Sequence, residues 1–226
     1  MITNRAQNLG MRAVMCVIAI SALSSTAHAQ LDWEPETPGA PTIDSTVRAA
    51  LRGGTEDVRG RARTVSDVLL LATLGVAITD TILDPLSHDD PDALGPSLFF
   101  GASALALTWT LGELVKHATV RARPYTLACD EAPFACDARA ATLSFYSLHA
   151  ALAATGAAMV CARRSALGDA WDTGICIGSI GAAAAVALLR IVGDMHHATD
   201  VVVGALLGIA SGLAFGALVS SSSELR

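Results

Sequence analysis

The sequence predicts an all-α protein, folded as a helical bundle of about five membrane-spanning or buried helices. Its 226 residues are 52% hydrophobic and only 16% charged, and the mean hydropathy is +0.49, which exceeds that of ordinary soluble domains. Long apolar segments follow one another, and no proline after Pro133 interrupts them. A disordered chain is therefore excluded, and the length fits one main domain.

The first 29 residues have the features of a secretory signal peptide. Arg5 and Arg12 form a basic region, residues 13–23 are apolar, and Ala27 and Ala29 give the small residues of a cleavage site. We expect cleavage after Ala29, and an uncleaved first membrane helix is the alternative. Either way, the chain from residue 30 onward begins outside the cytoplasm.

Residues 30–64 are expected to form an exported arm. Prolines 35, 38 and 41 exclude a regular helix in its first part. Over residues 45–63, arginines are interspersed with apolar residues, a pattern that fits a surface helix broken at Gly53 and Gly54. This helix could lie on a membrane or be solvated.

The helical domain is predicted over residues 65–220, with a short C-terminal tail at 221–226. Its apolar segments are at about 66–85, 97–117, 147–162, 173–192 and 198–219, each near the length that a bilayer requires of a helix. The third and fourth are rich in alanine and only weakly lipophilic, so a soluble bundle stays an alternative. In the last segment, Gly204, Gly208, Gly212 and Gly216 would let another helix approach closely.

If the chain from residue 30 begins outside the cytoplasm and each apolar segment crosses the membrane, the topology follows. The connections 118–146 and 193–197 emerge together on the periplasmic face, and 86–96 and 163–172 lie in the cytoplasm. Arg163 and Arg164 then fall inside, as the distribution of positive charge in membrane proteins favours. An acidic stretch on the cytoplasmic side is predicted to be a solvated loop rather than a metal site. It consists of Asp80, Asp84, His88, Asp89, Asp90 and Asp92.

The net charge and the cysteine content exclude some classes of partner and of functional site. With 15 basic against 21 acidic residues, the formal charge is −6, which argues against a nucleic-acid partner. Cys129 and Cys136 bracket a polar loop and could close a disulfide in an oxidising compartment. Cys161 and Cys176 lie in apolar runs and are predicted to be small buried residues. No Cys-x-x-Cys occurs, so nothing supports a zinc or redox site.

Polar residues that could bind a ligand or act in catalysis form three clusters at predicted helix ends on the periplasmic face. The only lysine begins the first cluster, Ser147 and His149 open the third segment, and the last cluster joins segments four and five. The residues are Lys116, Arg123 and Pro124; Ser147 and His149; and Arg190, His196 and Asp200. A bundle would bring these clusters together.

Such a set of side chains is suited to a phosphate group. Lys116, Arg123 and Arg190 would bind its non-bridging oxygens, the arginines in a bidentate way. Ser147 and the backbone amide of Leu148 would complete the oxyanion cradle. Glu113 is expected to pair with Lys116 or to face the bundle. Arg121 and Arg139 would widen the positive mouth or act as ordinary interface arginines.

The histidines would supply the chemistry. His196, oriented by Asp200 one helical turn away, would attack phosphorus and form a phosphohistidine. His149 would protonate the leaving oxygen and then activate water. No metal and no cofactor is needed, because the three cations already provide the charge stabilisation.

These clusters resemble the type 2 phosphatidic acid phosphatase family, which includes bacterial class A acid phosphatases and vanadium haloperoxidases. The family signature is Lys-x6-Arg-Pro, Pro-Ser-Gly-His and Ser-Arg-x5-His-x3-Asp. The first block matches in full, and the third matches at Arg190, His196 and Asp200. The resemblance covers roughly residues 65–220 and implies an all-α bundle and the same metal-independent histidine mechanism. It also implies lipid or other phosphomonoester and diphosphate substrates.

Three positions depart from the signature. Tyr146, Leu148 and Leu189 stand where the family has proline, glycine and serine. A leucine in place of glycine is expected to narrow or turn the phosphate pocket.

The sequence therefore predicts one function and leaves two alternatives. The first is an inner-membrane phosphatase with a periplasmic active site, acting on a phosphorylated lipid or isoprenyl diphosphate. The alternatives are a soluble periplasmic acid phosphatase of the same family and a catalytically degenerate membrane scaffold or lipid-binding protein. The sequence contains no signal for an oligomeric state.

Overall fold

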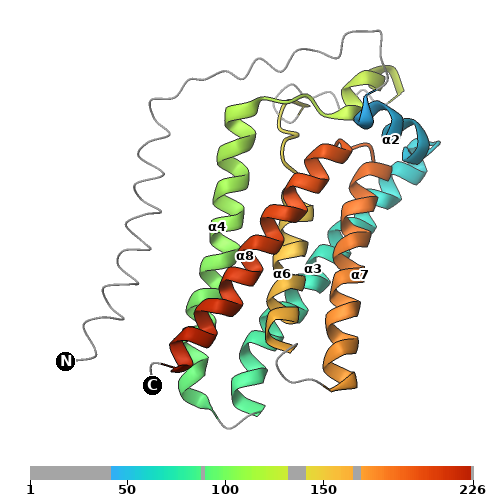
Figure 1. The fold of residues 1–226 in the computed structure, drawn as a ribbon. Coiled ribbons are helices and arrows are strands. Elements are labelled where there is room, and N and C mark those ends of the chain that lie inside the picture. The colour runs from blue at the N-terminus through green and yellow to red at the C-terminus, as the bar shows by residue number, and fades with distance from the viewer. Residues whose placement is uncertain (1–41, 88–89, 132–140, 165–168, 225–226) are drawn as a thin grey trace. The chain divides into compact units, whose positions relative to one another are not determined.

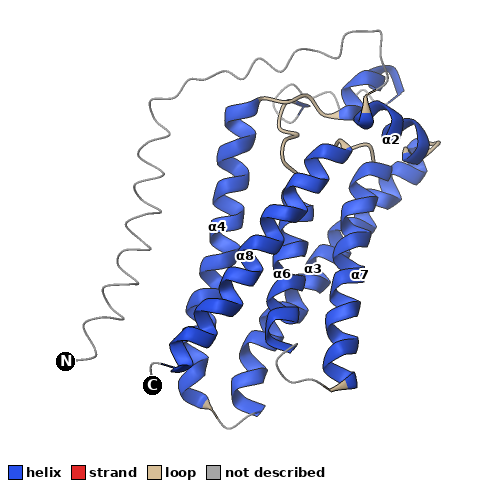
Figure 2. Ribbon diagram, in the orientation of Figure 1, coloured by secondary structure: helices blue, strands red, loops and turns tan. Residues whose placement is uncertain are grey.

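A computed structural model describes residues 42–87, 90–131, 141–164 and 169–224. The predicted signal peptide and the proline-rich part of the arm lie outside these residues. Within them, all regular elements are helical (Figure 2), which confirms the predicted all-α class. The α-helices are α2 (Ile43–Leu51), α3 (Glu56–Ser87), α4 (Leu94–Thr119), α6 (Leu148–Arg164), α7 (Ala170–Val192) and α8 (Ala198–Glu224), and the 3-10 helices are η1 (Pro91–Ala93) and η2 (Pro124–Glu131).

Helix α6 is the central element of the bundle. It packs against α3, α4, α7 and α8, and Figure 1 shows it among these longer helices. Every residue from Leu148 to Val160 except His149 is buried. Protein surrounds this helix, so small side chains are needed to let its neighbours close in. The alanine content and weak lipophilicity of the third segment follow from that position.

Helices α3, α4 with η1, α7 and α8 are each long and apolar enough to cross a membrane. Large apolar side chains project outward from them, including Leu71, Trp109, Ile177 and Leu206. A surface of this kind matches the hydrocarbon interior of a bilayer. The structure is therefore consistent with a multi-pass membrane protein.

The glycines of α8 bring it into close contact with α6. A Cβ built on Gly208 would lie 2.1 Å from the carbonyl oxygen of Ala151, and one on Gly204 would lie 2.5 Å from that of Ser147. No side chain fits at either place. The predicted close approach through small residues is confirmed, and it fixes the start of α8 against the start of α6.

The described part of the arm begins with helix α2. Thr42 and Ser45 form a capping box at the start of α2. The helix ends before Gly53 and Gly54, as predicted, and the arginines at 59, 61 and 63 belong to the first turns of α3. Helix α2 contacts α7 and α8, beside the end of the bundle where α7 stops and α8 starts (Figure 1).

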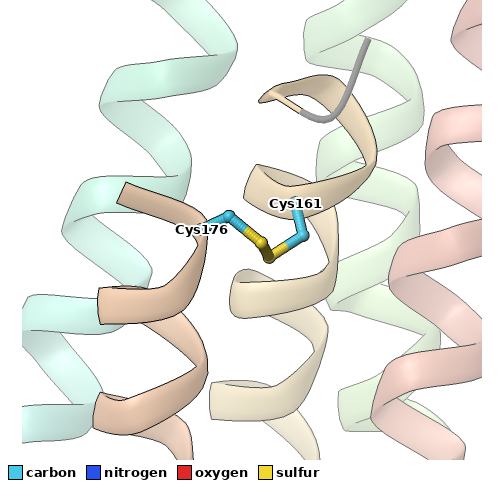
Figure 3. Close-up of a disulfide and its surroundings, with 2 residues drawn as sticks. All are labelled: Cys161 and Cys176. Atoms are coloured by element: carbon cyan, nitrogen blue, oxygen red, sulfur yellow. A yellow bond between two sulfur atoms is a disulfide. The ribbon is translucent and has the colours of Figure 1, made fainter. Parts of the chain in front are cut away.

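A disulfide joins α6 to α7 near the other end of the bundle. Cys161 and Cys176 face each other across a Cα–Cα distance of 4.7 Å (Figure 3). The prediction that they are unbonded buried residues is wrong, because the short α6–α7 connection brings one turn of each helix into register. Cys136, and with it the expected Cys129–Cys136 pair, lies outside the described residues.

The acidic stretch is also arranged differently from the prediction. Asp80 and Asp84 lie on α3, which continues through Pro85 to Ser87, and they are not in a loop. Asp80 is 5% exposed and pairs with Arg164, while Asp84 pairs with Arg163 at 2.9 Å. The solvated-loop prediction is therefore wrong for these two residues. His88 and Asp89 are outside the described residues.

Candidate active site

The three polar clusters meet at one end of the bundle. Helix α4 ends there, α6 begins there, and the turn between α7 and α8 lies beside them (Figure 1). The turn is tied to the connection after α4, because the amide of Tyr125 donates to the carbonyl of Asp194 at 3.2 Å. The amide of Ser147 donates to the carbonyl of Asp200 at 3.0 Å, which ties the starts of α6 and α8 together.

His196 lies in the α7–α8 turn and is 2% exposed. Its Nδ1 is 2.8 Å from the backbone carbonyl oxygen of Ser144. Because a carbonyl only accepts, Nδ1 carries the hydrogen and the lone pair stays on Nε2. Asp200 Oδ2 is 3.6 Å from Nδ1, too far for a hydrogen bond. His196 precedes α8, so the carboxylate of Asp200 lies at ion-pair distance from the ring and the Ser144 carbonyl accepts the direct hydrogen bond; an orienting role for Asp200 stays a prediction.

Burial, together with the cations around His196, keeps the imidazole neutral. Burial lowers its pKa to about 3, and the nearby cations of Arg123 and Arg190 act in the same direction against the carboxylate of Asp200. At neutral pH the ring therefore presents a lone pair inside a positive environment. That is the state that a nucleophilic histidine needs.

Asp200 is fully buried and held by several donors. Ser144 Oγ donates to its Oδ2 at 2.6 Å, and the amide of His197 donates to the same oxygen at 2.9 Å. Arg121 pairs with its Oδ1. Arg121 is 3% exposed and points inward, so the expectation that it widens the mouth is wrong. Arg139 is outside the described residues.

His149 lies on the first turn of α6 and contacts a carboxylate from α3. Its Nε2 is 2.9 Å from Asp67 Oδ1, and Arg190 Nη1 donates to the same oxygen at 3.0 Å. Asp67 thus joins two predicted site residues. Asp67 belongs to no motif, so the sequence alone did not identify it. The signal available was a lone carboxylate near one end of an apolar segment, which is costly unless it has a function.

The three cations occupy the same end of the bundle. Lys116 Nζ lies 3.0 Å from Glu113 Oε1, as expected, and its charge acts on His149. The amide of Arg123 donates to the carbonyl of Ala141 at 2.7 Å, and burial lowers the pKa of its guanidinium. Arg190 is 5% exposed.

Arg190 also has an unsatisfied donor. Among the described residues, its buried Nε has no hydrogen-bond partner. A buried donor without an acceptor is costly unless a ligand or water provides one. Arg190 already donates through Nη1 to Asp67 and is repelled by the nearby charge of Arg123, which points to an anion as the missing acceptor.

Ser147 and Leu148 begin α6 in a different way from the one predicted. Ser147 is fully buried, and its Oγ accepts from the amide of Ala150 at 3.4 Å, so the hydroxyl caps the helix. The Leu148 side chain is 6% exposed and belongs to the core cluster with Leu70 and Leu152. The side chain of Leu148 therefore packs in the core between the helices.

Comparison with protein families places these features in context. The PAP2 superfamily matches residues 98–222, which is more than half of the chain and includes all three polar clusters. No curated protein and no solved structure matches the chain. The superfamily consists of enzymes of the phosphatase and haloperoxidase type. The chain belongs to the PAP2 superfamily.

Proposed function

We propose that the protein is a membrane phosphatase that hydrolyses a phosphomonoester or diphosphate on a lipid, with its active site on the periplasmic face. The observation that carries this proposal is the state of His196. Its Nδ1 donates to the carbonyl of Ser144 at 2.8 Å, which leaves Nε2 as a buried nucleophile among cations. PAP2 membership supports a phosphoesterase.

In the first step, His196 Nε2 attacks phosphorus and the bond from phosphorus to the leaving oxygen breaks. Lys116, Arg123 and Arg190 bind the non-bridging oxygens, and the unpartnered Nε of Arg190 supplies one donor. Burial lowers the pKa of His149 to about 4, so the ring takes up its proton when the negative phosphate binds beside it, and it then gives this proton to the leaving oxygen. The imidazole gains positive charge as the phosphohistidine forms, and the buried carboxylate of Asp200, 3.6 Å away, stabilises that charge.

In the second step, water releases the phosphate. His149 takes a proton from the water molecule, the oxygen attacks phosphorus, and the bond to His196 Nε2 breaks. Asp67, 2.9 Å from His149 Nε2, orients the ring and stabilises it when it is protonated. Both steps are balanced in protons and use no metal ion.

The exterior of the bundle supports a lipid substrate. Four helices have the length and hydropathy to cross a membrane, and the polar clusters lie together at one end of them. A head group could reach the cations while its chains stay among the apolar side chains outside. This arrangement favours a membrane phosphatase over the soluble alternative, and carbonate extraction tests it: release of the protein would support the soluble alternative.

The test of the chemistry is phosphate release by the detergent-purified protein in EDTA. The substrates are phosphatidic acid, undecaprenyl diphosphate and p-nitrophenyl phosphate. We expect turnover by the wild type, and a loss of at least about 10³-fold in His196→Ala. His117→Ala is the matched control, because His117 is exposed on α4, and it should retain full activity.

Two results would contradict the proposal. Activity retained in His196→Ala would exclude His196 as the nucleophile. No turnover of any substrate by folded wild-type protein would instead support the degenerate scaffold. Acid-labile, alkali-stable phosphate on the enzyme after rapid quenching of labelled substrate would identify the phosphohistidine directly.

A further inference from the structure

The exported arm places a buried carboxylate next to the proposed active site. Asp44 of α2 is 7% exposed, and α2 precedes the part of the chain that matches the PAP2 superfamily. Asp44 Oδ1 accepts from the amide of Thr199 at 2.9 Å, and Oδ2 accepts from its hydroxyl at 2.7 Å. The carboxylate thus satisfies donors in the first turn of α8, where negative charge is stabilising.

A single guanidinium links Asp44 to the site. Arg121 Nη2 donates to Asp44 Oδ2 at 2.7 Å, and its Nη1 pairs with Asp200 Oδ1. The side chains of all three residues are at most 8% exposed. Arg121 is therefore shared between two buried carboxylates, one from the arm and one from the site. The planar fork of arginine suits this bridging, which a lysine ammonium would not reproduce.

The chain of contacts continues to His196. The other oxygen of Asp200, Oδ2, accepts from Ser144 Oγ at 2.6 Å. The carbonyl of the same serine accepts from His196 Nδ1 at 2.8 Å. From Asp44 to His196, each link is a hydrogen bond or ion pair between buried groups, where such interactions are least screened.

A second anchor fixes α2 in place. Arg48 donates to both carboxylate oxygens of Asp194 at 2.7 and 2.8 Å, and Arg52 Nε donates at 2.7 Å. The amide of Gly53 donates to the carbonyl of Val192 at 3.0 Å. Asp194 is 1% exposed. This anchor holds the helix without contacting Asp200, so docking of α2 and the link through Asp44 can be tested separately.

We infer that Asp44 is a positioning residue for the reaction, acting through Arg121 to hold Asp200 and His196 in the geometry of attack. The inference rests on the function proposed above. Without the charge of Asp44, the guanidinium of Arg121 would offset more of the negative charge of Asp200. The imidazole would then be stabilised less as it becomes positive. The cations that bind phosphate are unchanged, so kcat falls while KM stays the same.

The experiment uses the full chain with Asp44→Asn, which keeps the shape of the side chain and removes its charge. We expect kcat to fall at least tenfold and KM to stay within twofold. Arg121→Lys should lower kcat in the same way, and it carries the test if Asp44→Asn does not fold. The matched control is Asp57→Asn, which removes an equivalent charge from the exposed pair with Arg61. Its kcat should equal that of the wild type.

A docking role alone predicts a different pattern. Arg52→Ala weakens the second anchor, so it should lower the melting temperature and leave kcat unchanged. If Asp44→Asn likewise lowers the melting temperature and retains wild-type kcat, the inference is overturned.

A readout without turnover separates this inference from the proposed function. In protein labelled with 15N-histidine, Asp44→Asn should change the imidazole signals of His196, and Asp57→Asn should not. If the wild type hydrolyses none of the substrates, the proposed function fails, and the imidazole signals still test the link. Unchanged signals in both Asp44→Asn and Arg121→Lys would overturn it.

Discussion

Leu148 of α6 fits against Gly112 of α4: a Cβ built on Gly112 would lie 2.7 Å from Leu148 Cδ1. The same Cβ would lie 3.6 Å from the ring of Tyr146. Two of the departures from the family signature, Leu148 and Tyr146, therefore occupy space that a glycine on the neighbouring helix leaves open. The core accommodates them, and the start of α6 keeps its place at the site.

This fit predicts a pairwise coupling. Gly112→Val should destabilise the protein by about 1–3 kcal/mol, because the added methyl groups overpack the core around Leu148. Combined with Leu148→Ala, the same substitution should cost less. Unfolding free energies of the wild type, the two single variants and the double variant measure the coupling. Strictly additive costs would contradict the packing described.

The contact of Asp67 with His149 and Arg190 predicts a loss of activity from a conservative change. Asp67→Asn should lower kcat about tenfold, because the protonated state of His149 loses the carboxylate that stabilises it. Steady-state kinetics with the best substrate measure this, with Asp57→Asn as the control on the same helix. Unaltered kcat in Asp67→Asn would show that the contact has no part in the reaction.

The close contact of α8 with α6 predicts that Gly208 is intolerant of any side chain. Gly208→Ala would place its Cβ 2.1 Å from the backbone oxygen of Ala151, which cannot move without displacing α6, so we expect a loss of about 3 kcal/mol or more. Gly75→Ala is the control, because nothing lies within 4 Å of its Cβ. That variant should be neutral or stabilised by up to about 1 kcal/mol through helix propensity. Similar melting temperatures for the two variants would contradict the arrangement.

The Cys161–Cys176 bond predicts a loss of stability far from the site. The bond closes a loop with a sequence separation of 15, for which chain entropy gives up to about 3 kcal/mol. Cys161→Ser with Cys176→Ser should lower the melting temperature and leave kcat unchanged. Peptide mapping without reduction should find the two cysteines linked. Alkylation of both thiols in unreduced protein would argue against the bond.

The buried state of His196 predicts a pH dependence of stability. Its pKa in the folded protein is about 3, against an ordinary value of 6.5. Between these values the unfolded chain binds a proton that the folded protein excludes, so stability is complete above pH 6.5 and is lost as the pH falls. The loss should reach about 2 kcal/mol at pH 5. Unfolding measured from pH 7 to 5 should show this slope in the wild type and a smaller one in His196→Gln; equal slopes would assign the effect to other groups.

The same sign holds at lower pH for the carboxyl that anchors α2. Burial raises the pKa of Asp194, but the hydrogen bonds from Arg48 and Arg52 outweigh burial and hold the pKa below its ordinary value of 3.8. The anchor is therefore complete above that pH and weakens only below it. The window from pH 7 to 5 thus isolates His196 from this anchor.

The sequence by itself determined the helical bundle and identified most residues of the candidate active site. Helices follow from long apolar segments without proline, which is a local property, and the three clusters are recognisable because their spacing is local as well. Lys116, Arg123 and Arg190 could be recognised as candidates for that reason, together with His149 and His196. The high alanine content of α6 also agrees with its central position in the bundle.

Only the tertiary structure decided which residues are partners. Asp67 and His149 are far apart in the chain, as are Asp44 and Thr199, and no local pattern records their contact. The spacing of His196 and Asp200 suggested one helix face, but α8 begins at Ala198, so the carbonyl of Ser144 takes the hydrogen bond. Pairing of Cys161 with Cys176, and the turning of Leu148 into the core, depend in the same way on how helices pack. The packing energy depends on contacts between residues that are far apart in the chain. Local sequence patterns do not reveal these contacts.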